Sequence, residues 1–299
     1  MAEPTLFYGN PSTMALEDPA MTQALTGDDW DKHWAEMHTA AQLNPAQDYR
    51  RTLLINYLRG VFPNAGQDLR LLDIGCGTGD FARSFLGTFP QAQYLGIDVS
   101  VAGIEICRHK VPGASFEQQD LLAPRPVPAE YQGWATAAIC SEVLEHVDDP
   151  ELVLTNAIPY LAESALLLVT VPGGPMSAFD QYIGHRQHFT TAALQSLLEG
   201  LGFKVQEVWG AGFPFFNLYR MVVIARGRRL VDDASQASGR MTLASRAVMR
   251  LFGVLFRCNF KRSSLGWQRF AVAVAGPLKT HLQARGVTQQ HPPEIPAIR

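Results

Sequence analysis

A glycine-rich turn in the first third of the chain is the clearest candidate for binding chemistry. It follows a short apolar run and reads Leu72-Asp73-Ile74-Gly75-Cys76-Gly77-Thr78-Gly79-Asp80. Its three glycines permit a tight backbone turn and let a ligand lie against bare amides. Three glycines so close together also cost conformational entropy, so a turn without a ligand is the weaker interpretation. The spacing therefore predicts a site for a small molecule with an anionic end.

Two carboxylates further along the chain indicate which class of small molecule binds at this turn. A dinucleotide fingerprint requires its third glycine where this chain has Asp80, which argues against a nicotinamide cofactor. Asp98 ends a predicted strand, where a carboxylate can accept hydrogen bonds from both hydroxyls of a ribose. Asp120 follows the next predicted strand, where it could accept from an adenine amino group. Two acids in these places favour a nucleoside without phosphates.

Four segments in this order resemble the signature motifs of class I S-adenosylmethionine-dependent methyltransferases: LLDIGCGTG, YLGIDVS, QQDLL and SEVLEHVDDP. The resemblance covers about residues 69–171. It implies an α/β fold with a doubly wound, seven-stranded, mostly parallel sheet of strand order 3-2-1-4-5-7-6. It also implies S-adenosyl-L-methionine as the cofactor and S-adenosyl-L-homocysteine as its product.

The same resemblance assigns cofactor-binding roles to individual positions. The residues expected to bind the cofactor are Asp73, Gly75, Cys76, Gly77, Gly79, Asp98, Val99, Asp120, Leu121, Ser141 and Glu142. Asp73 and the glycine turn would hold the methionine part, and Asp98 the ribose. Asp120 and Leu121 would hold the adenine, with Val99 on its face. Ser141 and Glu142 would lie near the sulfonium, where a carboxylate favours a cation by Coulomb attraction.

Three histidines are candidate catalytic bases: His146, His185 and His188. His146 belongs to the SEVLEH segment and is either a general base or a ring held by backbone groups. The other two lie in GHRQHFT, which resembles a stretch found in many members of the family. Histidines that titrate near neutrality can accept a proton from a hydroxyl or an amine. In the alternative interpretation, Thr190 caps the next helix while His185 and Arg186 pair with carboxylates.

Two aromatic groups are expected on the acceptor side. Trp30, His33 and Trp34 would form a lid, and the other expected substrate-facing residues are Arg186, Phe213, Phe215 and Phe216. An aromatic wall favours a partly apolar acceptor, although both groups could equally be core packing. The four cysteines show no CxxC spacing and no close histidine partner, so no metal site is expected.

The periodicity of apolar residues predicts the elements that position these side chains. Strands are expected at 69–74, 93–97, 115–117, 135–140, 165–171, 204–209 and 220–225, and helices from about 80 and at 101–109, 150–161 and 191–201. The short connection between the last two strands predicts that they pair antiparallel. Alternating strands and helices are typical of an open doubly wound sheet.

The chain divides into four expected parts. Residues 1–28 are predicted to be a flexible N-terminal extension, residues 29–68 a helical lid, and residues 69–229 the cofactor-binding core. Residues 230–299 are predicted to hold a linker at 231–240, a basic amphipathic helix at 241–260 and a flexible tail at 286–299.

Composition restricts the class of protein and its partners. With 299 residues, 47% of them hydrophobic, the chain can bury a large core, which excludes disorder and fibrous repeats. Residues 1–219 carry 11 Lys+Arg against 25 Asp+Glu, whereas residues 220–299 carry 14 against 3. The acidic body would repel nucleic acid. The basic segment would dock on the body, cover the substrate site or a partner subunit, or rest on an anionic membrane.

These observations predict an enzyme of biosynthesis. We expect a cytoplasmic S-adenosylmethionine-dependent methyltransferase that methylates oxygen or nitrogen of a small, partly apolar molecule by in-line displacement. No leader or membrane span is expected, and the oligomeric state is left open. Two alternatives remain: a lipid or membrane-held acceptor, with peripheral membrane contact through the basic helix, and a non-catalytic cofactor-binding regulator or partner subunit.

Overall fold

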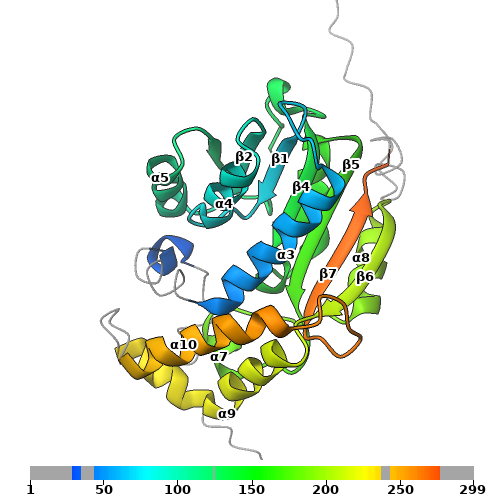
Figure 1. Cartoon of the computed structure of the whole chain (residues 1–299). Coiled ribbons are helices and arrows are strands. Elements are labelled where there is room, and N and C mark those ends of the chain that lie inside the picture. The colour runs from blue at the N-terminus through cyan, green and yellow to red at the C-terminus, as the bar shows by residue number, and fades with distance from the viewer. Residues whose placement is uncertain (1–28, 35–43, 124, 237–242, 277–299) are drawn as a thin grey trace, which may run out of the picture.

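A seven-stranded sheet forms the centre of the protein in a computed structural model that describes residues 29–34, 44–123, 125–236 and 243–276 (Figure 1). The strands are β1 (Arg70–Ile74), β2 (Gln93–Asp98), β3 (Ser115–Gln118), β4 (Ala135–Ser141), β5 (Leu161–Pro172), β6 (Lys204–Ala211) and β7 (Gln268–Val274). Their order is β3-β2-β1-β4-β5-β7-β6, and only β7 runs antiparallel to its neighbours. The predicted fold class and strand order are confirmed.

Helices cover both faces of this sheet and pack at one end of the molecule (Figure 1). They are α3 (Pro45–Val61), α4 (Asp80–Thr88), α5 (Val101–Lys110), α6 (Pro150–Ala157), α7 (Ala178–Tyr182), α8 (Thr191–Gly200), α9 (Phe215–Gln236) and α10 (Leu243–Leu255). Short 3-10 turns lie at Ala129–Tyr131, Leu144–His146, Ile158–Tyr160 and Phe256–Cys258. The side chains of Ser100, Asp149 and Thr190 accept a hydrogen bond from the first turns of α5, α6 and α8, which fixes where these helices begin.

The core consists of two apolar layers, one on each face of the sheet. Leu72 faces a layer that α6 and α8 cover, whereas the adjacent Leu71 faces a layer that α3, α4 and α5 cover. Successive strand residues point to opposite faces, so a strand buried on both sides is apolar throughout. This explains why the strands read as short continuous apolar runs.

The last strand of the sheet does not lie where the sequence predicted it. Residues 220–225 belong to helix α9, and the antiparallel partner of β6 is β7, far downstream. The run Val222-Val223-Ile224 is β-branched, but Val223 is buried while Met221 and Val222 are exposed, as one face of a helix requires. Because β7 lies between β5 and β6, the predicted end of the core at residue 229 is wrong.

The remaining predicted segments are confirmed in part. Helix α10 and the following 3-10 turn cover most of the helix expected at 241–260. The expected linker at 231–240 is helical as far as Gln236, beyond a kink at Gly227, whose φ is 45°. The expected helical lid comprises a short helix at 30–34 and α3. The terminal extensions predicted at 1–28 and in the tail from residue 286 lie outside the described residues.

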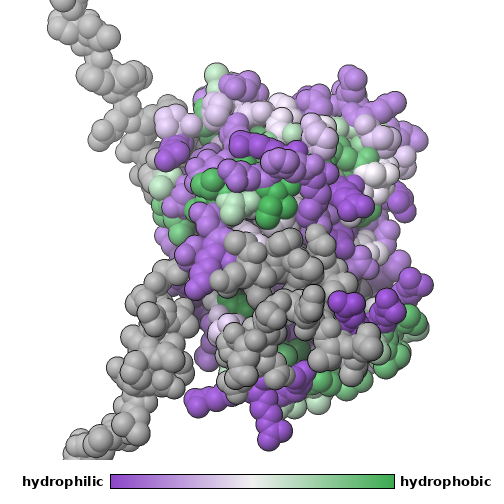
Figure 2. All heavy atoms as spheres, turned by 90° about the vertical axis from the view of Figure 1, so that its left-hand side faces the viewer, coloured by the Kyte–Doolittle hydropathy of each residue, from purple (hydrophilic) through white to green (hydrophobic). Residues whose placement is uncertain are grey.

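Helices α9 and α10 lie against α3 at one end of the molecule (Figure 1). An aromatic cluster joins them, in which Tyr49 of α3 contacts Phe216 and Phe256. On the neighbouring outer surface, Figure 2 shows hydrophobic side chains bordered by strongly hydrophilic ones. Within the described residues, no helix combines the length and the apolar character that crossing a bilayer requires.

Candidate functional site

A cavity of about 280 Å³ lies at the carboxyl end of the sheet. Open α/β sheets bind ligands here, where neighbouring strands send their connections to opposite faces. The predicted site residues that line it are Trp30, His33, Trp34, Asp73, Gly75, Cys76, Gly77, Ser141, Glu142, His146, His185 and Phe216. The predicted residues outside its lining are Gly79, Asp98, Val99, Asp120, Leu121, Arg186, His188, Phe213 and Phe215. One cavity therefore joins the glycine turn to the predicted acceptor side.

The glycine turn has the backbone that its sequence predicts. Gly75, Gly77 and Gly79 have φ of 74°, 54° and 74°, in the left-handed region that side chains other than glycine disfavour. The amide of Gly75 donates to the carbonyl of Ile97 at 2.8 Å, which ties the turn to the end of β2. The turn is thus fixed in place, and its residues Gly75, Cys76 and Gly77 line the cavity.

Asp98, at the end of β2, is hydrogen-bonded to the glycine turn. Its carboxylate accepts from the amides of Gly77 at 2.8 Å and Ser100 at 2.9 Å and is only 8% exposed. Burial raises the pKa of Asp98 to about 6, although both hydrogen bonds act in the opposite direction. Each carboxylate oxygen has a further lone pair, so Asp98 retains acceptor capacity for hydroxyl donors.

Asp73, at the end of β1, is the buried acid of the cavity. The hydroxyl of Tyr94 donates to its carboxylate. Burial raises the pKa of Asp73 to about 7, the Tyr94 hydrogen bond opposes this shift, and the charge of Asp98 adds to it. A cationic group bound beside Asp73 would restore its ionised form.

The outer residues of the predicted cofactor site follow β2 and β3. Val99 is exposed and Leu121 is buried. Asp120 accepts from the amide of Leu122 at 2.8 Å, which shapes the turn after β3. Their cofactor roles remain predictions, since they flank the cavity without lining it.

The segment at 29–34 covers the glycine turn. Asp31 accepts from the hydroxyl of Ser100 at 2.6 Å and from the amide of Ala102 at 3.0 Å, which anchors the segment at the start of α5. A Cβ added to Gly77 would lie 2.9 Å from the indole of Trp34. The ring of Trp30 lies 4.9 Å from that of His146, edge to face. The role of this segment as a lid remains a prediction.

Glu142 is fixed by residues from three separate elements. Its φ of 58° is unusual for a residue with a side chain, and such strain is often found at functional sites. One carboxylate oxygen accepts from Gln268 of β7 at 2.8 Å and from Thr170 of β5 at 3.3 Å. The other lies 3.4 Å from the guanidinium of Arg50 on α3. Neither Arg50 nor Gln268 belongs to a motif, so neither was predicted to lie in the site.

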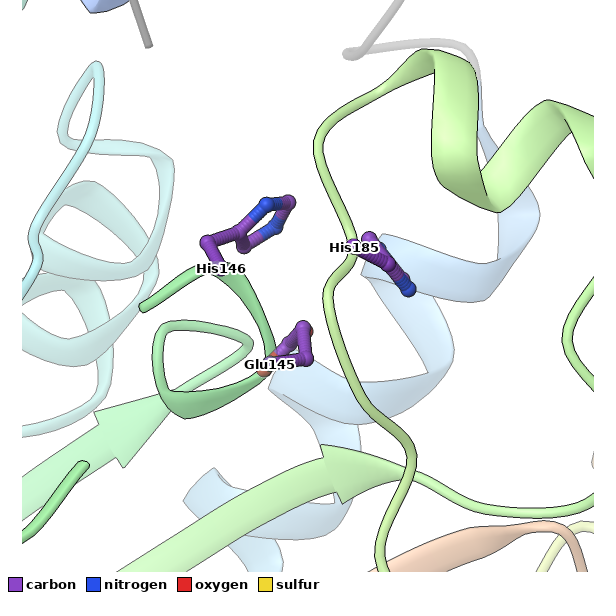
Figure 3. Close-up of side chains that lie close together, drawn as sticks. All are labelled: Glu145, His146 and His185. Carbon is purple, nitrogen blue, oxygen red and sulfur yellow. The ribbon is translucent and has the colours of Figure 1, made fainter. Parts of the chain in front are cut away.

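Glu145 and His146 follow in the same turn, and only His146 was a predicted site residue. Glu145 is 0% exposed, and burial raises its pKa well above the usual range. Burial also lowers the pKa of His146 to about 4. The ring of His185 packs on that of His146 at 4.7 Å, from the loop that follows α7 (Figure 3). Glu145 could have been found from its place in the SEVLEH motif.

The loop after α7 is anchored by a buried ion pair. Arg220 of α9 binds both carboxylate oxygens of Asp180, each at 2.7 Å. Burial acts to raise the pKa of Asp180, but Arg220 holds it at about 2. Burial, and then the charge of His146, lower the pKa of His185 to about 2. His188 is held by the carbonyl of Gly174 at 3.0 Å.

The remaining predicted acceptor residues are only partly brought together. Phe216 lines the cavity, whereas Phe213 stacks on Phe260 outside it. Phe215 packs in the aromatic cluster, and Arg186 forms an ion pair with Asp148. The expected wall of three phenylalanines thus contributes one ring to the cavity.

Comparison with known families agrees with this geometry. Residues 46–208, more than half of the chain, match the model of a family described as a methyltransferase domain. The chain therefore belongs to this family, and its strand order is that of the class I S-adenosylmethionine-dependent methyltransferases.

Relatives with assigned activities match part of the chain. A trans-aconitate 2-methyltransferase of Methylobacterium nodulans is 30% identical over 103 residues, 34% of this chain and 38% of that protein. A ubiquinone biosynthesis O-methyltransferase of Chromobacterium violaceum is 30% identical over 126 residues, 42% of this chain and 49% of that protein. The match thus spans less than half the length of either relative.

A solved structure matches more of the chain. It belongs to the complex between the Haloferax volcanii Trm112 methyltransferase activator and a protein assigned as a methyltransferase, with a TM-score of 0.53 and 15% identity. The match covers 84% of this chain and 100% of that chain. At this identity the likeness concerns the fold alone.

Proposed function

We propose that the protein transfers a methyl group from S-adenosylmethionine to an oxygen or nitrogen of a small, partly apolar molecule. The observation that carries this proposal is the single cavity that joins the glycine turn to a polar wall containing Glu142, His146 and His185. Two relatives that match part of the chain are named for methylating small molecules, trans-aconitate and an intermediate of ubiquinone biosynthesis.

The residues present fit the methyl donor. Gly75 and Gly77 leave their backbone bare toward the cavity, where a side chain at Gly77 would meet Trp34. Asp73 supplies a buried acid for the amino group of the donor, and Asp98 retains lone pairs for ribose hydroxyls. When bound, the donor supplies an electrophilic methyl group on a sulfonium.

The remaining residues of the cavity position the acceptor. In-line displacement is accelerated mainly by holding the acceptor near the methyl group and excluding water. The lid residues Trp30 and Trp34 exclude water, and Phe216 offers an apolar contact. Burial lowers the pKa values of His146 and His185 to about 4 and about 2, so these neutral rings add polar atoms to the acceptor side of the cavity.

Two measurements test this function. Calorimetry should show binding of S-adenosylhomocysteine but not of NADH. Untargeted mass spectrometry of small-molecule extracts incubated with the protein and donor should then reveal a product heavier by one methylene unit. Binding without turnover on any extract would favour a non-catalytic regulator, and absence of binding would contradict the proposal.

One surface favours a membrane-held acceptor as a second candidate. Helices α9 and α10 expose large apolar side chains, among them Leu251, which is 56% exposed. Figure 2 shows hydrophobic and strongly hydrophilic side chains next to each other on this side of the molecule. The exposed apolar residues are Leu218, Met221, Val222, Val248, Leu251 and Val254, and the exposed arginines among and beside them include Arg226, Arg246, Arg250 and Arg257. An apolar surface with basic side chains complements anionic lipid, each basic residue contributing about 1 kcal/mol.

Flotation with anionic liposomes tests this second candidate. Truncation before α10 would also remove β7 from the sheet, so point variants are required. Leu251→Glu with Val254→Glu should abolish flotation, whereas Val61→Glu, at an exposed position of α3, should not. Wild-type protein that fails to float would remove the candidate.

A further inference from the structure

The turn after β4 buries polar atoms that the described structure does not satisfy. Glu145 is 0% exposed, and neither of its carboxylate oxygens has a hydrogen-bond partner. The Nδ1 atom of His146 is also buried without a partner. Leaving a buried polar group without a hydrogen-bond partner destabilises a folded protein. Two adjacent residues of this kind indicate a site built to hold a ligand.

His185 completes this site from a second segment. It lies on the loop after α7, beside the turn that carries the other two residues (Figure 3). Potential ligand atoms of Glu145, His146 and His185 all lie within 4.8 Å of one another. In a tetrahedral site with ligand atoms about 2.0–2.2 Å from the ion, those atoms are about 3.3–3.6 Å apart. The three side chains must therefore rotate toward one another to share one ion.

We propose that Glu145, His146 and His185 bind a divalent transition-metal ion. Two imidazole nitrogens and one carboxylate oxygen form a donor set typical of Zn²⁺ and of other first-row ions such as Fe²⁺. No metal site was predicted from the sequence, because its cysteines show no CxxC spacing and no close histidine partner. Here the ligands come from two segments that only the fold brings together.

A neighbouring group of possible ligands is already satisfied. Asp180, His185 and His188 also lie close together. However, both oxygens of Asp180 are bound by Arg220. Nδ1 of His188 lies 3.0 Å from the carbonyl of Gly174, and its Nε2 lies 3.2 Å from His185. This second group therefore orients His185, as partners of metal-bound histidines commonly do.

The metal would face the cavity. Glu145, His146 and His185 all belong to its lining, so coordination positions not used by the protein open toward the acceptor side. If the proposed methyl transfer is correct, an acceptor oxygen would occupy one position, and the ion would favour its ionised form. Metal binding itself does not depend on the methyl donor.

Titration with Co²⁺ followed by visible absorption, with Zn²⁺ competition, tests the proposal. The full chain is used without a histidine tag and after treatment with a chelator. We expect one ion per chain. Glu145→Gln, which keeps the side-chain shape, and His185→Ala should each lower the affinity at least about tenfold. The matched controls Glu151→Gln and His109→Ala, both at exposed positions, should bind as wild type does.

The outcomes separate this proposal from the proposed function. Wild-type protein that binds no Co²⁺, or folded Glu145→Gln and His185→Ala variants that bind it as tightly as wild type, would overturn the metal site. Thermal melting establishes that each variant is folded. Metal binding together with no affinity for S-adenosylhomocysteine would leave the metal site standing and contradict the methyltransferase assignment.

Discussion

Nδ1 of His185 lies 3.2 Å from Nε2 of His188, and this contact fixes the tautomers of both rings. The Nδ1 atom of His188 lies 3.0 Å from the carbonyl of Gly174, which can only accept a hydrogen bond. Nδ1 of His188 therefore carries its proton, and Nε2 of the neutral ring accepts. His185 must then donate through Nδ1, which leaves a lone pair on its Nε2.

These tautomers can be observed by nuclear magnetic resonance. Long-range proton–nitrogen correlation spectra of the metal-free protein at pH 7 should show Nδ1–H and bare Nε2 for both rings. His109, an exposed ring on α5, provides the internal comparison. An Nε2–H tautomer at His188 would contradict the arrangement derived from Gly174.

Replacement of Asp98 tests the predicted ribose contact. Asp98→Ala should weaken binding of S-adenosylhomocysteine by roughly 1.5–3 kcal/mol, the scale for hydrogen bonds to a charged group. Asp98→Asn, which keeps one acceptor oxygen, should fall between this variant and wild type. Calorimetry measures both, with Glu105→Ala on the exposed side of α5 as the control. Unchanged affinity in Asp98→Ala would remove the cofactor role of this residue.

The contact between Gly77 and Trp34 tests the position of the lid. Gly77→Ala places a Cβ 2.9 Å from the indole at a φ of 54°, a backbone state that costs other residues about 1–2 kcal/mol. Binding of S-adenosylhomocysteine should weaken about tenfold or more. Adding Trp34→Ala should restore part of the affinity by relieving the clash. If Gly77→Ala binds as wild type does, the turn does not contact the ligand.

Most of the fold could be predicted from the sequence because its parallel strands are buried on both faces. Such strands are short apolar runs followed by helix signals, as at Leu72 before the glycine turn. The antiparallel edge was harder to predict. Residues 222–224 and 270–274 are both apolar runs, and only the pairing of β7 with β5 and β6 shows which one enters the sheet.

The cofactor side of the candidate site could be predicted best where a motif lies next to a strand. Asp73, Asp98 and the glycines fall within such motifs. Arg50 and Gln268 reach Glu142 from α3 and β7, and their roles depend on packing between distant segments. Nothing local to their sequence distinguishes them from other surface or strand residues.

The buried acid Asp73 makes stability depend on pH. Burial raises its pKa from about 3.8 to about 7 in the folded protein, so the folded state retains a proton that the unfolded state releases between these values. The proton that the folded state retains therefore contributes to the free energy of unfolding below pH 4. This contribution is lost as the pH rises toward 7. Asp73→Asn does not titrate and still accepts from Tyr94.

We therefore expect Asp73→Asn to raise the melting temperature of the ligand-free protein more at pH 8 than at pH 4.5. One pKa unit corresponds to about 1.4 kcal/mol, so the difference should amount to a few kcal/mol at most. Asp68→Asn at an exposed position should show no such trend. A gain that is equal at both pH values would indicate that Asp73 is ionised throughout.

The ion pair between Arg220 and Asp180 should contribute strongly to stability. Asp180 is 0% exposed, and Arg220→Met would leave its carboxylate buried without a counter-charge. Removing one partner of a buried pair costs about 3–5 kcal/mol. Urea unfolding should show a loss of this size, while Arg228→Met at an exposed position of the same helix should be nearly neutral.

A second variant separates charge from packing at this pair. Arg220→Met combined with Asp180→Asn removes the uncompensated charge and keeps an acceptor for Ser177. The double variant should therefore recover more than half of the lost stability. If it is as unstable as Arg220→Met alone, the arginine stabilises α9 through the packing of its side chain, and the loop that carries His185 is not held electrostatically.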